Sequence, residues 1–191
     1  EGLGTRFIPF NRGRGEGVLT GEGNPLDDGV DDYPMHYMWD DILRCDSLIE
    51  LITKFVFIQR EQKVDELTGK KSIKEKLIFP RYHQRDAVRK LLANAKFNGT
   101  QLNYLIEHSA GSGKTNTIAW LAHRLVSLHD IQNHIVYDSV LVITDRVVVD
   151  RQLQDAIKGI DHKSGLVCTI DDKKTSADLA DALAGNSKII V

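Results

Sequence analysis

Apolar residues in the second half of the chain alternate between helical spacing and short continuous runs. Residues 82–95 place Ala87, Val88, Leu91 and Leu92 on one face, which predicts an amphipathic helix. The run at 140–144 is typical of a central parallel strand buried on both faces. Further strands are expected at 102–106, 166–170 and 188–191, and further helices at 114–129, 150–157 and 175–185. The last of these helices is expected to be capped by the segment Thr-Ser-Ala-Asp at 175–178. This alternation predicts a doubly wound α/β fold, a parallel sheet with flanking helices.

The first half of the chain has a different pattern. Residues 1–38 carry eight of the fifteen glycines and three of the four prolines, which favours irregular loops and turns. Residues 39–79 first have helical spacing, with a Ser-x-x-Glu capping box at Ser47. A strand at 55–59, a turn at 67–70 and a returning strand at 76–79 then predict a hairpin. We therefore expect an irregular tail (1–38), a helical and hairpin connector (39–79) and an α/β region (80–191).

Residues 108–115 read His-Ser-Ala-Gly-Ser-Gly-Lys-Thr and lie between a predicted strand and a predicted helix. This layout is typical of a P-loop, in which backbone N–H groups and a helix N-terminus bind phosphate oxygens. Small residues permit the close approach, although His108 replaces the first glycine of the usual pattern. The predicted loop residues are Ser109, Ala110, Gly111, Ser112 and Gly113. The segment predicts a nucleoside triphosphate site.

Two residues at the end of this segment carry the predicted chemistry. The Lys114 ammonium can reach the β- and γ-phosphates, and the Thr115 hydroxyl can ligate Mg²⁺. Both are therefore the predicted catalytic residues, with Thr115 as the protein ligand of the metal.

A second segment, Phe-Pro-Arg-Tyr-His-Gln at 79–84, ends 30 residues before Lys114. The Gln84 amide can accept a hydrogen bond from adenine N6–H and donate one to N7, so it can select ATP over GTP. Arg81 and Tyr82 offer flat faces for stacking on the base. Gln84 and Arg81 are therefore predicted to bind the nucleotide.

The segment Thr-Asp-Arg at 144–146 follows a predicted buried strand. Loops at the carboxyl ends of parallel strands form the working edge of an open α/β sheet. A hydroxyl and a guanidinium suit phosphate oxygens, so Thr144 and Arg146 are candidate contacts to a nucleic-acid backbone.

Composition and net charge limit the kinds of protein that this chain can be. The 191 residues have a net charge of −2, so any nucleic-acid contact must come from a local patch. Cys45 and Cys168 lie far apart without further ligands, which predicts a reduced, cytoplasmic protein with no zinc site. The longest apolar runs fall far short of the roughly 20 residues that a membrane span needs, so no membrane association is expected. The chain stops within a predicted strand, and we expect it to be part of a longer protein.

Five segments in this order resemble the restriction (motor) subunit of type I restriction-modification enzymes, which are superfamily-two helicase-like translocases. The segments are 7–13 (Phe-Ile-Pro-Phe-Asn-Arg-Gly), 23–25 (Gly-Asn-Pro), 37–43 (Tyr-Met-Trp-Asp-Asp-Ile-Leu), 78–84 and 108–115. The resemblance implies a RecA-like fold, ATP and Mg²⁺ as cofactors, and translocation of double-stranded DNA. It also implies modification and specificity subunits as partners.

The resemblance assigns roles along the chain. Residues 1–38 are similar to the end of a nuclease domain and its linker, and 80–191 to the first part of the first RecA-like ATPase lobe. Gln84 takes the place of the adenine-reading residue, and Thr144 and Arg146 lie in the loop that holds the tracked strand. The nuclease site, the Asp-Glu-x-His segment and the second lobe are expected outside this chain, so the lobe is incomplete and inactive by itself.

Two other functions remain open. A free-standing P-loop kinase or nucleotide-binding regulator would share the phosphate loop but does not explain Gln84 or the segment at 144–146. An inactive linker or interaction module between nuclease and motor fits the glycine- and proline-rich beginning of the chain.

Overall fold

The fold is described from a computed structural model. It covers residues 10–13, 23–24, 33–64, 69, 71–145, 147–160, 165–170, 174–185 and 187–191. Most of the predicted tail at 1–38 and the residue Arg146 therefore lie outside the described residues, as does the hairpin turn except for Gly69.

A small parallel sheet organises the C-terminal part of the chain. Its strands are β3 (Val140–Leu141), β4 (Val167–Cys168) and β5 (Ile189–Ile190), with β5 in the centre. The Val142 and Val191 amides extend the ladders by donating to Ile190 O and Cys168 O at 2.8 and 3.0 Å. A mixed α/β fold with a parallel sheet, as predicted from the sequence, is confirmed.

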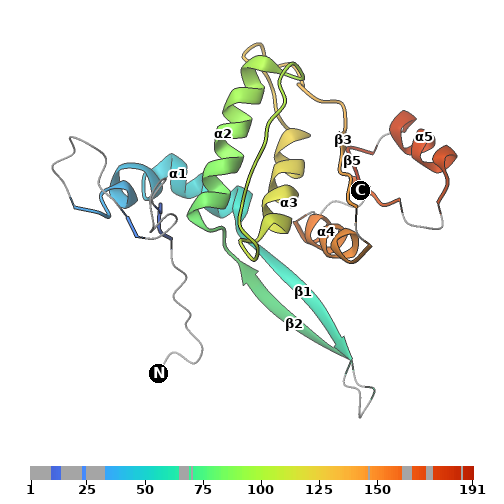
Figure 1. The fold of residues 1–191 in the computed structure, drawn as a ribbon, viewed down its shortest axis with the longest axis horizontal. Coiled ribbons are helices and arrows are strands. Elements are labelled where there is room, and N and C mark those ends of the chain that lie inside the picture. The colour runs from blue at the N-terminus through green and yellow to red at the C-terminus, as the bar shows by residue number, and fades with distance from the viewer. Residues whose placement is uncertain are drawn as a thin grey trace.

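Four helices accompany this sheet: α2 (Tyr82–Asn98), α3 (Lys114–Leu125), α4 (Val147–Ile160) and α5 (Ser176–Ala184). The first core cluster joins α3 and α4 to β5, through Ala119, Ala122, Leu153, Ala156, Ile157 and Ile189. In Figure 1, α2 and α3 lie side by side, and α4 lies below the sheet. The predicted cap of α5 is confirmed, since Thr175 is its N-cap and the Thr175 backbone amide donates to Asp178 Oδ2 at 2.6 Å.

The connector before α2 begins with the short helical turns η1 (Met38–Ile42), α1 (Cys45–Glu50) and η2 (Leu51–Phe55). The capping box predicted at Ser47 is wrong, because Arg44 is the N-cap of α1 and Ser47 lies inside the helix. Its hydroxyl instead contacts the Arg85 guanidinium and Asp41. The Ser47 side chain therefore makes long-range polar contacts and not the helix cap that the local pattern predicted.

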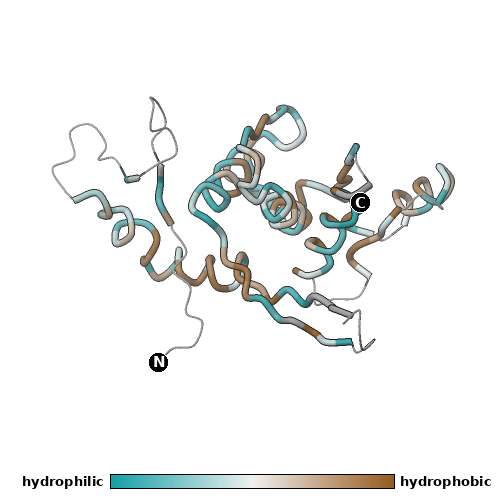
Figure 2. Tube along the Cα trace, turned by 60° about the horizontal axis from the view of Figure 1, so that its bottom comes forward, coloured by the Kyte–Doolittle hydropathy of each residue, from teal (hydrophilic) through white to brown (hydrophobic). Residues whose placement is uncertain are grey.

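The predicted hairpin forms with longer strands than expected. Strands β1 (Phe57–Val64) and β2 (Lys71–Ile78) pair antiparallel from Phe57 with Ile78 to Val64 with Lys71. The hairpin extends away from the helices (Figure 1), and Figure 2 shows a hydrophobic base and a mostly hydrophilic outer part. Phe57 and Ile78 at the base enter a second core cluster with Phe55, Val88, Leu92 and Trp120.

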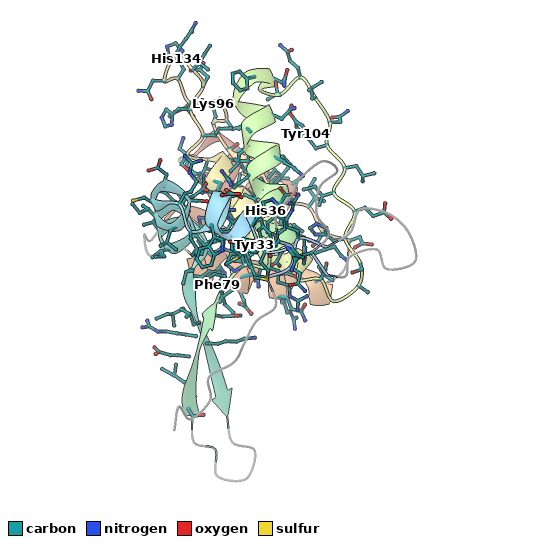
Figure 3. The ribbon with its side chains drawn as sticks, turned by 90° about the vertical axis from the view of Figure 1, so that its left-hand side faces the viewer. Tyr33, His36, Phe79, Lys96, Tyr104 and His134 are labelled. Carbon is teal, nitrogen blue, oxygen red and sulfur yellow. The ribbon has the colours of Figure 1, made fainter. Side chains whose placement is uncertain are left out.

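Two strand predictions are wrong. Residues 102–106 are extended but unpaired, because the described sheet contains only β3, β5 and β4. Figure 3 shows Tyr104 on this segment beside α2, and its hydroxyl donates to Asn94 Oδ1 at 2.8 Å. The run at 140–144 is not buried on both faces either, since Ile143 is 82% exposed and β3 has a neighbour on one side only. A run of apolar residues favours burial, but it forms a strand only where another strand is available for hydrogen bonding.

The helices described here include none with the length and apolar character of a transmembrane span.

Candidate phosphate-binding site

The loop at 108–113 leads directly into the first turn of α3. Gly111 and Gly113 have φ values of +73° and +86°, a left-handed conformation that favours glycine. Gly113 is the N-cap of α3, and its carbonyl accepts from the Asn116 and Thr117 amides at 3.1 and 3.3 Å. The predicted loop residues therefore precede the N-terminus of a twelve-residue helix, whose dipole favours a bound anion.

Gly113→Ala is expected to destabilise the protein by about 3 kcal/mol, because it adds backbone strain and disrupts a contact. A Cβ at this position would lie 2.5 Å from Gln84 Nε2 and would displace that amide. Gly111→Ala is the matched control, since its φ is also positive but nothing lies within 4 Å of the added Cβ. We expect it to cost about 1 kcal/mol. Urea unfolding of the two variants measures the difference, and equal losses would contradict the role of the Gln84 contact.

Lys114 folds back onto its own loop. Its Nζ donates to His108 O at 2.8 Å and to Ser109 O at 2.7 Å, and the residue is exposed. An ammonium group has three donors, so these contacts hold Lys114 at the mouth of the loop with one donor to spare. Thr115 follows in the first turn of α3 and is half-buried.

The first turn of α2 lies against the same loop. Gln84 is only 3% exposed, and its Oε1 accepts from the Arg81 amide at 2.8 Å. Its Nε2 donates to Ser112 O at 3.3 Å and to Gly113 O at 2.8 Å. The amide that was predicted to read adenine thus contacts the loop at 108–113 in this structure, and adenine selection by Gln84 stays a prediction.

Two neighbours of Gln84 contact the loop as well. The Arg81 guanidinium donates to Gly111 O at 3.5 Å, and His83 Nε2 lies 3.1 Å from Ser112 O. The contact of His83 was not predicted from the sequence, although His83 directly precedes Gln84 in the segment at 79–84. No spacing rule marks a single histidine as the partner of a carbonyl 29 residues away.

His108, which replaces the first glycine of the usual loop pattern, packs its ring against that of His83 in an edge-to-face arrangement. The ring centroids are 4.9 Å apart and the planes are nearly perpendicular, at 84°. Burial lowers the pKa of His108, and the neighbouring His83 and Lys114 lower it further, so the neutral form is favoured. Both histidines line a cavity of about 460 Å³ between α2 and the extended segment.

An aromatic cluster brings the N-terminal residues to the start of α2. The Phe10 ring lies 5.9 Å from Phe79 and 5.7 Å from Tyr82, and Tyr37 lies 5.4 Å from Tyr82. The Tyr37 hydroxyl donates to Phe10 O at 2.6 Å. In Figure 3, Phe79 is seen below the start of α2. The Tyr82 ring, which was predicted to offer a face to the base, therefore packs against Phe10 and Tyr37.

A buried arginine joins the connector to α2. Arg85 is 2% exposed and lies 3.4 Å from Asp41 and 3.9 Å from Glu50. Arg89 contacts both carboxylates, at 3.1 Å from Asp41 and 3.4 Å from Glu50, and Arg124 lies 2.9 Å from Glu50. Burial raises the pKa of Asp41, but the hydrogen bonds and charges of Arg89 and Arg85 outweigh it and hold this pKa below its usual value.

The predicted nucleic-acid contact Thr144 lies just beyond β3. Its hydroxyl donates to Asp150 Oδ1, on α4, at 3.3 Å, and both residues line a cavity of about 400 Å³. The second predicted contact, Arg146, lies outside the described residues. Their binding to a nucleic-acid backbone stays a prediction.

The chain is similar to proteins of restriction systems. Residues 77–191 match the protein family described as "Type III restriction enzyme, res subunit". A protein of Methanocaldococcus jannaschii with the provisional name type I restriction enzyme MjaVIIP endonuclease subunit is 29% identical over 125 residues. The match covers 64% of this chain and 11% of that protein, so the chain spans about a tenth of its length. No solved structure matches the chain.

Proposed function

This chain belongs to the family of type III restriction enzyme res subunits, and from that premise we propose that it forms part of an ATP-dependent double-stranded DNA translocase. Its sequence is helicase-like and related to restriction enzymes. The family description says type III, whereas the relative's name says type I. We assign the chain to a type I enzyme because the segments at 7–13 and 37–43 resemble that class.

The observation that carries the proposal is the loop before α3. Two left-handed glycines and the helix N-terminus form a backbone surface suited to phosphate groups. Lys114 already donates to two carbonyl oxygens at the loop mouth and would exchange them for the β- and γ-phosphate oxygens of ATP.

The donor set also fits Mg²⁺. The described residues contain no group of histidine, cysteine or acidic side chains able to hold a metal by themselves. Mg²⁺ bound with a nucleotide takes most of its ligands from phosphates and water, so one hydroxyl from the protein is sufficient here. Thr115 would supply that hydroxyl, and the bound ion would neutralise charge on the phosphates.

We further propose that residues 80–191 form an incomplete RecA-like lobe, preceded by a connector (39–79) and a tail from the nuclease side (1–38). Leu105 in the unpaired segment is 91% exposed, and Ile143 beyond β3 is 82% exposed. Apolar side chains this exposed are expected where further strands of the lobe cover them.

Double-stranded DNA is the proposed substrate, and modification and specificity subunits are the proposed partners. Thr144 and Arg146 would contact the DNA backbone after β3. A free-standing kinase or nucleotide-binding regulator predicts ATP binding that DNA does not affect. An inactive linker module predicts neither ATP binding nor a response to DNA.

The test measures ATP and GTP binding by the full-length subunit with Mg²⁺, and its ATPase rate with and without DNA. We expect Gln84→Ala to weaken binding of both nucleotides, because the loop loses its contacts to the Gln84 amide. It should also reduce the preference for ATP by about 10-fold, because it removes the proposed contacts to adenine. If Gln84 only supports the loop, both affinities fall equally and the preference stays.

The DNA contact is tested separately. Arg146→Ala is expected to reduce DNA stimulation of the ATPase, with Arg151→Ala on the exposed side of α4 as the matched control. ATP binding without any response of the unmodified subunit to DNA would favour the regulator.

A further inference from the structure

Three successive carbonyl groups of the phosphate loop are bound from one turn of α2. Arg81 contacts Gly111 O, His83 contacts Ser112 O, and Gln84 contacts both Ser112 O and Gly113 O. We call these three side chains the carbonyl clamp. Of the two contacts to Ser112 O, that of His83 is the shorter, at 3.1 Å against 3.3 Å for Gln84.

The carbonyl clamp determines where the loop amides point. A peptide unit is planar and trans, so its C=O and N–H groups face opposite directions. When Ser112 O and Gly113 O face α2, the amides of Gly113 and Lys114 must face away from it. These are amides of the kind that a phosphate-binding loop presents to its ligand.

The His83 ring is the hydrogen-bond donor in its contact with Ser112 O. A carbonyl oxygen can only accept, so Nε2 of His83 must carry the hydrogen. The His108 ring packs against the His83 ring in an edge-to-face arrangement, at 4.9 Å between centroids. His108 stands where the usual loop pattern has glycine, and a glycine there would leave this side of the His83 ring without support.

We propose that His83, supported by His108, is a positioning residue that orients the phosphate-facing amides of the loop. The inference rests on the proposed nucleotide site and names a residue in it that sequence patterns did not mark. It also gives a reason for the histidine at position 108. The His108 ring supports the His83 ring, whereas a glycine at this position would make the loop more flexible.

The experiment uses the full-length subunit with Mg²⁺ and two probes, ATP and inorganic tripolyphosphate, which lacks a base. His83→Ala is expected to weaken both by about 10-fold, because the lost contact affects only the phosphate side. His83→Gln is expected to stay within about 2-fold of the unmodified protein, since its amide nitrogen can reach the position of Nε2. His83→Asn, which is too short, should resemble His83→Ala.

The outcomes separate the inference from the proposed function. Unchanged tripolyphosphate binding in His83→Ala would overturn the inference, and so would equal losses in the Gln and Asn variants, which indicate general packing. If the unmodified subunit binds neither probe, the proposed function fails and the inference falls with it. Since His83→Gln preserves the size and polarity of the site, it remains informative even if His83→Ala folds poorly.

The support from His108 is tested with a double-mutant cycle. His108→Gly restores the usual loop residue and is expected to weaken tripolyphosphate binding by about 3-fold. In the His83→Ala background the same change should have no further effect, because His108 acts through the His83 ring. A 3-fold loss in both backgrounds would overturn this part of the inference.

Discussion

Lys114→Ala is expected to weaken ATP binding by about 100-fold, the largest effect of any single change at the site. The Lys114 ammonium lies at the loop mouth, where it donates to His108 O and Ser109 O. A hydrogen bond from a charged group contributes about 1.5–3 kcal/mol, and this group would bind two phosphates of the ligand. Titration calorimetry of the full-length subunit with ATP and Mg²⁺ measures the loss.

Lys90→Ala is the matched control for this change. Lys90 is also an exposed lysine, but it lies on α2 and pairs with Asp86 at 2.8 Å. Its removal should leave ATP binding within about 2-fold of the unmodified value, because an exposed pair contributes little. Similar ATP affinities of the Lys114→Ala variant and the unmodified subunit would contradict the proposed phosphate site.

Trp120→Ala is expected to destabilise the helical region by about 4 kcal/mol. Trp120 is 1% exposed and packs against the rings of Phe55 and Phe57 at 5.7 and 6.1 Å. Its indole N–H donates to Phe55 O at 2.8 Å. The change would leave a cavity between α3, the hairpin base and the connector, and it would leave that carbonyl without its donor.

Hydrogen exchange of peptides from α2 and α3 locates this effect, since 4 kcal/mol corresponds to about a 1000-fold faster exchange through opening. Trp120→Phe is the control, because it keeps a ring in the core and loses mainly the hydrogen bond. We expect about 1–2 kcal/mol for it. Equal losses in the two variants would mean that the hydrogen bond, and not the ring volume, dominates the stability of this cluster.

Local sequence patterns predicted the elements that depend on neighbouring residues. The apolar spacing in α2 and α4 and the cap at Thr175 depend on residues only a few positions apart in the chain. The parallel sheet was predicted from the alternation of such local elements. The hairpin was expected as well, and its pairing begins at Phe57 and Ile78, whose side chains lie in the second core cluster.

The failed predictions concern contacts between distant segments. Residues 102–106 have the composition of a strand, but pairing depends on a partner that composition cannot name. Ser47 has the sequence of a cap, yet it contacts Arg85, 38 residues away. The loop at 108–115 was predicted as a segment by itself, but the carbonyl clamp joins it to residues 81–84. No short sequence motif predicts that side chains at 81–84 contact the carbonyl groups of this loop.

The first turn of α2 also limits how this chain can change in length during evolution. Gln84 binds the phosphate loop, and its neighbour Arg85 binds carboxylates of the connector. One inserted or deleted residue rotates the rest of a helix by about 100°, so it would detach both partners at once. The length of this turn is therefore constrained as strictly as its residues, because a shift of one position would break the contacts to the loop and to the connector together.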